Sequence, residues 1–246
     1  MRAFFILVVL GGLLAGCAAK EEPTLRMVTE PTYPPYEFLR GRQVVGVDVE
    51  LCKAVAAKCG RAFKTVSVDF DAIIPSLLSG KADIAAAGLT VTEDRRKSVD
   101  FSEPYMKTGL VIIFRKAKPY RTAETCRGAR VGVQGGTTGD EYTVKELHQE
   151  PERFRTYPEA VAALKAGRCD LVLCDAILAK NCILGEKDLE LSGFVTSEEY
   201  AIAVKKGRPE LLALVNETIA AAKADGRLEK WASDFTAEAE SMKGSK

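Results

Sequence analysis

Two residues of opposite charge could hold a small charged ligand. Arg95 lies in Thr92-Glu93-Asp94-Arg95, where Thr92 is expected to cap a short helix that follows a buried strand. A guanidinium grips a carboxylate through two parallel hydrogen bonds. Asp175 follows the apolar run 171–174, so its carboxylate could cap the next helix or bind an ammonium group in a cleft. For Arg95 the alternative is a solvated basic face of its helix.

A glycine-rich turn is a second candidate for anion binding. A strand is expected to run into Gln134-Gly135-Gly136-Thr137-Thr138-Gly139, and a helix is expected to follow. Backbone N–H groups and two hydroxyls at a helix start favour a small carboxylate. The turn lacks both the Gly-Lys-Ser/Thr of a Walker A loop and a G-x-G-x-x-G pattern, which argues against a nucleotide. A plain strand-to-helix turn is the alternative.

An acid and two aromatic residues could line the rest of such a pocket. Glu30 ends an expected strand and precedes the proline-rich turn 31–38. Tyr33 and Phe70 could sandwich an aliphatic stem whose polar end meets Glu30, although the turn could also be a rigid packing element. One guanidinium, one anion-binding helix start and one carboxylate together suit a zwitterion.

The composition argues against several classes of protein. The chain has 246 residues, 47% of them hydrophobic and 28% charged, with a formal net charge of +1. Such neutrality gives no electrostatic footprint for nucleic acid. A single histidine, His148, argues against a His-ligated metal site and a Ser-His-Asp triad, so no metal and no cofactor are expected.

The first sixteen residues are expected to direct export. The apolar run 3–14 is too short to span a bilayer and suits the core of a signal peptide. It ends in Leu14-Ala15-Gly16-Cys17, which resembles the bacterial lipobox. That resemblance implies cleavage after residues 1–16 and a lipid on Cys17, with 17–23 as a lipidated tether. An ordinary signal peptide is the alternative.

The remaining chain alternates short β-branched runs with helical segments, which predicts an α/β fold. Strands are expected at 26–30, 63–66, 83–86, 110–114, 129–134, 170–174 and 200–204. Helices are expected at 48–58, 72–78, 140–148, 158–165, 176–184, 209–224 and 228–235. Residues 70–84 and 157–171 echo each other: each predicts a helix, then a glycine, a basic residue and an Asp opening a strand. Two similar lobes would produce this echo, although any αβ unit has a similar form.

Taken together, the chain resembles the bacterial extracellular solute-binding proteins of the polar amino acid family, the receptors of ABC importers. The similarity covers about residues 25–235, most tellingly at 32–38, 70–77, 88–95, 101–105 and 134–139. It implies two α/β lobes, a hinge of two crossing segments and an interlobe ligand cleft. The implied parts are lobe one at 24–108 and 201–237, lobe two at 112–196, hinges near 107–111 and 197–200, and a C-terminal tail at 238–246.

The resemblance also assigns roles within the cleft. By the family pattern, Arg95 holds the α-carboxylate of an amino acid, and Asp175 takes its α-ammonium. The residues that complete the carboxylate grip are Thr90, the backbone of Gly88, Thr137 and Thr138, of which Gly88 and Thr90 also help with the ammonium. The residues that line the side-chain pocket are Tyr33, Phe70 and Ala87, and those placed to set specificity are Glu30, Gln134 and Cys174.

Glu30 beside aromatic faces favours a cationic side chain, namely that of arginine, lysine, ornithine or histidine. Glutamine and cystine receptors of the family carry an acid near this position too, so those ligands stay open. The implied partners are the permease of an ABC transporter, its ATPase and the membrane through the lipid anchor. The protein is expected to be an exported monomer, on the outer side of the cytoplasmic membrane or in the periplasm.

Six cysteines remain after Cys17, and no two have Cys-x-x-Cys spacing. The resemblance implies a disulfide between Cys52 and Cys59. Seven residues of continuous helix span about 10.5 Å, beyond the Cα separation of about 7 Å that a disulfide allows, so the helix would have to break before Cys59. A bridge between Cys126 and Cys169 is a weaker expectation, and Cys174 and Cys182 could be free.

Two other functions share this fold. A cyclohexadienyl dehydratase needs a general acid in the cleft, and the amino-acid-binding pair Arg95 and Asp175 argues against it. A sensor module would need an output domain, and none is expected because the sequence ends about ten residues after Phe235.

Overall fold

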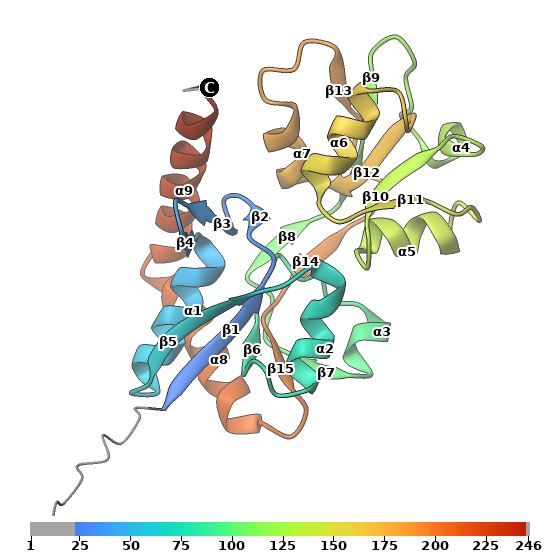
Figure 1. The fold of residues 1–246 in the computed structure, drawn as a ribbon. Coiled ribbons are helices and arrows are strands. Elements are labelled where there is room, and N and C mark those ends of the chain that lie inside the picture. Colours follow the sequence, from blue (N-terminus) through green and yellow to red (C-terminus); the bar gives the residue numbers. More distant parts are fainter. Residues whose placement is uncertain (1–22, 245–246) are drawn as a thin grey trace, which may run out of the picture.

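The computed structural model describes residues 23–244, so the expected signal peptide, Cys17 and most of the tether lie outside the described residues. The fold is α/β, as predicted, and contains two five-stranded sheets (Figure 1). The first sheet has the order β5-β1-β6-β15-β7: Ala62–Ser67, Thr24–Thr29, Ile84–Ala85, Ala203–Lys205 and Val99–Phe101. The second has the order β11-β10-β12-β9-β13: Glu152–Phe154, Val131–Gln134, Leu171–Asp175, Leu110–Arg115 and Leu189–Leu191.

Strand direction brings the chemistry to one edge of each sheet. In the first sheet, β1 runs parallel to β5 and β6, while β15 lies antiparallel between β6 and β7. In the second, β10 runs parallel to β11 and β12, and β9 is antiparallel to β12. The carboxyl ends of the parallel strands therefore meet at one edge, where open α/β sheets bind their ligands.

Helices cover the two sheets (Figure 1). Those of the first are α1 (Val47–Lys58), η1 (Phe70–Ala72), α2 (Ile73–Leu78), α3 (Glu93–Arg96), α8 (Pro209–Ala224) and α9 (Arg227–Gly244). Those of the second are α4 (Ala123–Cys126), α5 (Thr138–Lys145), α6 (Tyr157–Lys165) and α7 (Ala176–Ile183). A small sheet, β2 (Thr32–Tyr33), β3 (Glu37–Arg40) and β4 (Gln43–Val45), adjoins the first.

Two short strands join the sheets. The single strand expected at 200–204 is two strands, β14 (Glu198–Tyr200) and β15, because the chain leaves one partner for another there. β14 pairs with β8 (Met106–Thr108), whereas β15 pairs with β6 and β7 of the first sheet. Figure 1 places β8 and β14 between the two sheets, so the chain crosses twice, close to the expected hinge positions.

Two helices differ from their predicted bounds by more than one residue. α5 begins two residues before the predicted Asp140, because the Thr137 hydroxyl accepts from the Asp140 N–H and caps it, and it ends before His148, whose φ is 54°. α9 continues to Gly244, so residues 238–244, predicted as a tail, are helical. Arg40 in β3 pairs with Glu238 at 2.5 Å and its guanidinium lies over the Phe235 ring, which holds this extension against the fold.

The internal echo is present in three dimensions. Gly80 and Gly167 end α2 and α6 with φ values of 76° and 72°, a conformation that favours glycine. Asp83 receives Arg26 Nε and Nη2, both at 3.1 Å. Asp170 receives Arg130 Nε and Nη2, both at 3.2 Å. Each sheet therefore joins two parallel strands at their amino ends with the same Arg–Asp pair.

No disulfide joins any two of the six cysteines within residues 23–244. The predicted disulfide between Cys52 and Cys59 is wrong for this structure, because α1 runs unbroken to Lys58 and the Cys59 N–H still donates to the Val55 carbonyl at 3.0 Å. The weaker expectation for Cys126 and Cys169 is wrong too. Within residues 23–244, no helix combines the length and the apolar character that crossing a membrane requires.

Candidate functional site

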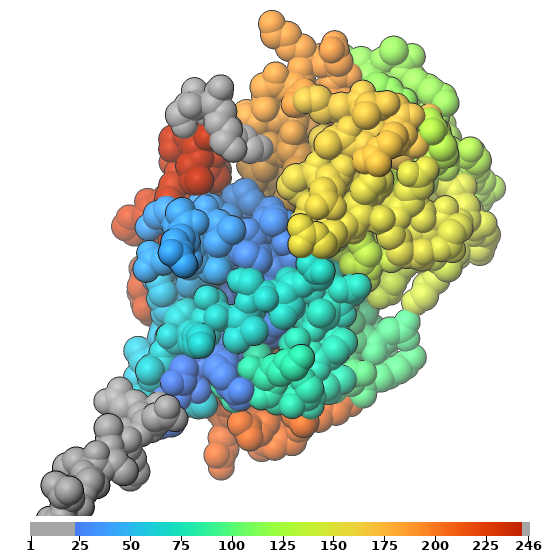
Figure 2. Space-filling view, viewed as in Figure 1, coloured from blue at the N-terminus to red at the C-terminus, as the bar shows by residue number. Residues whose placement is uncertain are grey.

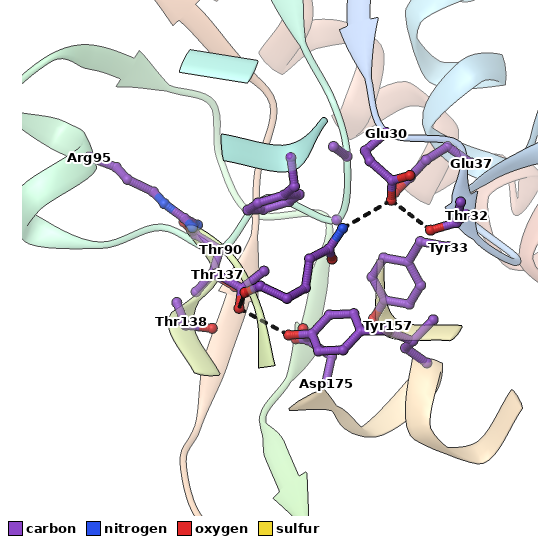
Figure 3. Close-up of a pocket in the computed structure, with 15 residues that line it drawn as sticks. Glu30, Thr32, Tyr33, Glu37, Thr90, Arg95, Thr137, Thr138, Tyr157 and Asp175 are labelled. Carbon is purple, nitrogen blue, oxygen red and sulfur yellow. Dashed lines mark hydrogen bonds between the residues drawn. The ribbon is translucent and has the colours of Figure 1, made fainter. Parts of the chain in front are cut away.

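The carboxyl ends of the strands converge on a pocket between the two sheets (Figure 3). All eleven residues predicted for ligand binding line it: Glu30, Tyr33, Phe70, Ala87, Gly88, Thr90, Arg95, Gln134, Thr137, Thr138 and Asp175. The lining also contains four residues that the sequence interpretation did not include: Thr32, Glu37, Tyr157 and Leu178. The space between the lining atoms amounts to about 380 Å³, a figure that includes open solvent, and the two halves of the molecule meet closely on the face shown in Figure 2.

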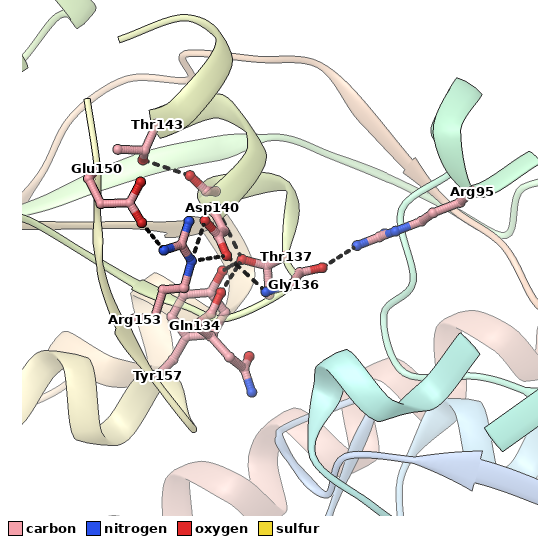
Figure 4. A network of polar contacts seen from close by, with 10 residues as sticks. Arg95, Gln134, Gly136, Thr137, Asp140, Thr143, Glu150, Arg153 and Tyr157 are labelled. Atoms are coloured by element: carbon pink, nitrogen blue, oxygen red, sulfur yellow. Dashed lines mark hydrogen bonds and ion pairs between the residues drawn. The ribbon is translucent and has the colours of Figure 1, made fainter. Parts of the chain in front are cut away.

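Arg95 is the cation of the pocket. Thr92 caps α3 as predicted, and Arg95 is the one buried residue of that helix. Its Nη1 donates to the Thr90 carbonyl at 2.8 Å, and its Nη2 donates across the cleft to the Gly136 carbonyl at 3.0 Å (Figure 4). Burial lowers the pKa of Arg95, although nearby carboxylates oppose this shift. The guanidinium is thus oriented in advance and has no carboxylate bound directly to it among the described residues.

The glycine-rich turn is held by a polar network (Figure 4). The Thr137 hydroxyl donates to the Gln134 carbonyl at 2.7 Å and contacts the Tyr157 hydroxyl at 3.1 Å. The Asp140 carboxylate accepts from the Gly136 N–H at 3.0 Å and from Arg153 Nε at 2.8 Å. The turn therefore presents Thr137 to the pocket from a fixed backbone.

Asp175 is the carboxylate of the pocket. It precedes α7 but makes no capping hydrogen bond with its side chain, so the helix-cap alternative does not apply. Its Oδ1 accepts from the Tyr200 hydroxyl at 2.5 Å, and that hydroxyl also contacts the hydroxyl of Tyr33 at 2.5 Å. Burial, with the nearby Glu198 carboxylate, raises the pKa of Asp175 to about 7. A ligand cation would therefore favour the ionised form of Asp175.

Gly88 has a more limited role than predicted. Its N–H donates to Asp48 Oδ2 at 3.0 Å, so this N–H is already engaged and only the carbonyl remains to receive an ammonium group. Its φ is 52°, and a Cβ at this position would lie 2.5 Å from Cε1 of Tyr33. Glycine is thus needed here for both backbone conformation and space.

Glu30 marks the other end of the pocket. Its Oε2 accepts from the Thr32 hydroxyl at 2.7 Å and from Gln134 Nε2 at 3.3 Å (Figure 3). Burial raises the pKa of Glu30, and both hydrogen bonds oppose this shift. Because Glu30 follows β1 and Gln134 ends β10, this contact joins the two sheets across the cleft.

A second carboxyl group lies at the same end. Glu37 is 1% exposed, and its Oε2 has no hydrogen-bond partner within the described chain. Burial first, and then the adjacent Asp48, raises the pKa of Glu37 well above its ordinary value. Asp48 itself accepts from the Tyr105 hydroxyl at 2.6 Å. Burial therefore favours the neutral form of Glu37, whereas two hydrogen bonds favour the carboxylate of Glu30, so Glu30 is the acid that could meet a cationic head.

Glu198 of β14 was missed by the sequence interpretation. Its Oε2 accepts from the Thr90 hydroxyl at 2.8 Å and from the Thr138 hydroxyl at 3.0 Å, so one carboxylate oxygen joins hydroxyls from both sides of the cleft. No motif in the sequence distinguishes Glu198 from its neighbour Glu199. Cys174, expected to set specificity, is instead buried in the hydrophobic core and is absent from the lining, because side chains alternate along β12.

Comparisons with known proteins identify the family to which this chain belongs. Residues 25–238 match the bacterial extracellular solute-binding proteins, family 3. The ABC transporter arginine-binding protein 1 of Escherichia coli K12 is 30% identical, over 94% of this chain and 97% of its own. The L-cystine-binding protein TcyJ of the same strain is 31% identical, over 86% and 84%. A solved structure of an ancestral arginine-binding protein bound to arginine superimposes with a TM-score of 0.80 and 37% identity, covering 87% of this chain and 99% of that chain. The chain therefore belongs to family 3 of the bacterial extracellular solute-binding proteins.

Proposed function

We propose that the protein is the substrate-binding lipoprotein of an ABC importer, and that it captures an L-amino acid with a cationic side chain, arginine before others. The observation that carries this proposal is the pairing of Arg95 and Asp175 in one buried pocket, with Glu30 at the opposite end. A relative named as an arginine-binding protein supports the same choice of ligand.

In the proposed complex, Arg95 receives the α-carboxylate, and Thr90, Thr137 and Thr138 line the space around it. To donate to the ligand, their hydroxyls would turn away from Glu198 and from the Gln134 carbonyl. Asp175 and the Gly88 carbonyl receive the α-ammonium. A buried zwitterion needs both of its charges met, because an unpaired charge in a low-dielectric site prevents binding. The pocket provides one partner for each.

The side chain of the ligand would extend from Asp175 towards Glu30. Tyr33 and Phe70 offer aromatic faces for an aliphatic stem, and Ala87 leaves room beside them. Glu30 would then meet the cationic head, with Gln134 beside it. Glutamine or cystine is the alternative ligand, and the cystine-binding relative keeps that alternative open.

Ligand capture is proposed to close lobe one (24–108 and 201–237) on lobe two (112–196) about the β8–β14 pair. Direct contacts already bridge the cleft in the described chain: Arg95 to the Gly136 carbonyl, and Lys145 to Asp94 at 2.7 Å. Because each lobe would supply part of the grip, the ligand binds the closed form better and shifts the population towards it. The permease and its ATPase would recognise that form.

Titration calorimetry of the unlipidated mature chain, refolded to remove bound ligand, tests the proposal. The ligands are arginine, lysine, ornithine, histidine, glutamine and cystine. We expect a cationic amino acid to bind most tightly. Tightest binding of glutamine or cystine would overturn the role of Glu30 but keep the receptor, and no binding of any amino acid would overturn the proposal.

Glu30→Gln sharpens this test. It should weaken the cationic ligand at least about tenfold, since a hydrogen bond to a charged group contributes about 1.5–3 kcal/mol. Binding of glutamine should not weaken. Glu217→Gln, an exposed carboxylate on α8, is the matched control and should change neither affinity.

A further inference from the structure

Basic side chains gather at the amino-terminal edge of the first sheet. β1, β5 and β6 begin at this edge, and the antiparallel β15 ends there. In Figure 1 it is the edge farthest from β8 and β14. Six basic residues define what we call the basal surface: Lys58, Arg61, Lys81, Lys205, Lys206 and Arg208.

Two surface grooves join these residues into one patch. One groove is lined by Arg61 and Arg208, and the other by Lys205 and Arg208, so Arg208 stands between them. Lys58 precedes Cys59, which lines the first groove, and Lys81 lies between two residues that line the second. The basal surface is therefore continuous from the end of α1 to the start of α8.

The charges of the basal surface are largely uncompensated. Its residues are exposed except for Arg61, which is half-buried. Arg61 pairs with Asp83 at 3.6 Å, whereas the other five form no ion pair within residues 23–244. Asp83 also carries the pair with Arg26, and Glu210 is the exposed acid in these grooves. Since the formal net charge of the whole chain is only +1, this concentration arises from arrangement and not from overall basicity.

The described chain begins beside this surface. Arg61 donates to the Thr24 carbonyl at 2.6 Å, so the first strand starts next to the basal cations. Thr24 lies seven positions after Cys17, and a fully extended chain over seven positions reaches at most about 25 Å. A lipid on Cys17 would therefore hold the basal surface close to a bilayer.

We propose that the basal surface docks on anionic phospholipid headgroups of the membrane that carries the anchor. This inference rests on the lipidation that is part of the proposed function. A plane of phosphate groups suits cations spread along one edge of a sheet, and each Lys or Arg near such a surface strengthens binding about fivefold.

Docking would fix the orientation of the receptor. The pocket lies at the carboxyl ends of the same strands, at the opposite edge of the sheet. A protein seated on its basal surface would hold the pocket away from the bilayer, accessible to ligand from solution. Engaging the permease would then require release from the lipid.

Vesicle sedimentation of the unlipidated mature chain tests the proposal without depending on the anchor. The probes are vesicles of phosphatidylcholine alone and of phosphatidylcholine mixed with phosphatidylglycerol. We expect binding to the mixed vesicles only, weakened by added salt. Failure to bind them, or equal binding to phosphatidylcholine alone, would overturn the proposal.

Charge reversal identifies the surface. Lys205→Glu, Lys206→Glu and Arg208→Glu together should weaken vesicle binding by at least about a hundredfold, since each lost cation counts about fivefold and each new acid adds repulsion. The matched control reverses three exposed cations outside the basal surface, on segments that flank the second sheet: Arg127, Lys180 and Lys187. They form no ion pair within residues 23–244, and this variant should bind nearly as wild type does. Equal losses in the two variants would overturn the assignment to the basal surface. Arginine binding, measured in parallel, reports separately on the proposed function.

Discussion

At the scale of single residues, the pocket separates two charges that the chain must keep buried. Arg95 is satisfied by two carbonyls and Asp175 by one tyrosine hydroxyl, so each has a neutral partner before any ligand arrives. Because these partners are neutral, the ligand can form the direct ionic interaction with each of the two residues. The ligand should therefore gain more from these two residues than from any hydroxyl in the pocket.

Loss of either charge should abolish measurable binding. Arg95→Gln or Asp175→Asn would leave a ligand charge buried and unpaired, at a cost of roughly 3–5 kcal/mol. Titration calorimetry should detect no arginine binding by either variant. Arg96→Gln is the control, because Arg96 is the exposed neighbour on the same helix. Wild-type affinity in either pocket variant would contradict the assigned grip.

Ligand affinity should fall in acid. Burial raises the pKa of Asp175 to about 7, yet an ammonium ligand needs the carboxylate, so below this pH a proton must leave on binding. From about pH 8 to about pH 6 the affinity should drop roughly tenfold. Because its pKa is raised in the folded protein, Asp175 stabilises the ligand-free fold most at low pH. This contribution is lost as the pH rises through about 7. Calorimetry at the two pH values, with circular dichroism to check folding, measures this, and equal affinities would rule it out.

At the scale of elements, the sequence predicted those with strong local signals. α8 has its predicted bounds, with Pro209 in its first turn and Gly226 at φ 74° after its end. Two of the errors, at 200–204 and at the end of α9, arise from distant partners. β14 and β15 separate because each finds a different strand, and α9 continues because Glu238 meets Arg40 from β3. Local propensities do not depend on such contacts and therefore cannot predict them.

The residues of the site divide in the same way: those with a signal in the sequence were predicted, and those placed by distant packing were missed. The eleven predicted lining residues came from motifs in the sequence together with the family resemblance, and the structure brings all of them to one pocket. Tyr157 and Leu178 reach the pocket from the faces of α6 and α7, so only the packing of those helices identifies them. Glu37 lies within the Pro-Pro-Tyr-Glu-Phe turn that the interpretation used, and its burial could not be read from the turn alone.

The crossing strand β14 should control closure through Glu198. Glu198→Ala removes the oxygen that accepts from Thr90 and Thr138 on the two sides of the cleft. We expect a larger radius of gyration for the ligand-free variant in small-angle scattering, and a roughly tenfold weaker ligand, since hydrogen bonds to a charged group contribute about 1.5–3 kcal/mol.

Two further variants interpret that result. Glu199→Ala is the control, because Glu199 is a half-buried neighbour whose partner, Lys107, belongs to the adjacent β8 and not to the pocket. Glu198→Gln keeps an acceptor oxygen and should lose less than the alanine variant. A change of the same size in Glu199→Ala would assign the effect to the strand in general and contradict the role of Glu198.

At the scale of the whole molecule, attachment is separable from capture. Cys17 lies outside the described residues and far along the chain from Arg95 and Asp175. Cys17→Ser should move the protein from the detergent phase to the aqueous phase on Triton X-114 partitioning, while arginine affinity stays unchanged. Unchanged partitioning would contradict lipidation, whereas lost arginine binding would contradict the separation of the two functions.

The order of the strands also limits when the first sheet can be completed. β15 lies between β6 and β7, yet it follows the entire second sheet in the sequence. Until residue 203 is available, β7 lacks its neighbour in that sheet. If the chain emerges from an export channel with its amino terminus first, all strands of the second sheet are available while the first sheet still lacks β15. Such a receptor can bind its ligand only after most of its length has crossed the membrane. Until then, the early strands of the first sheet would be available to a chaperone on the far side.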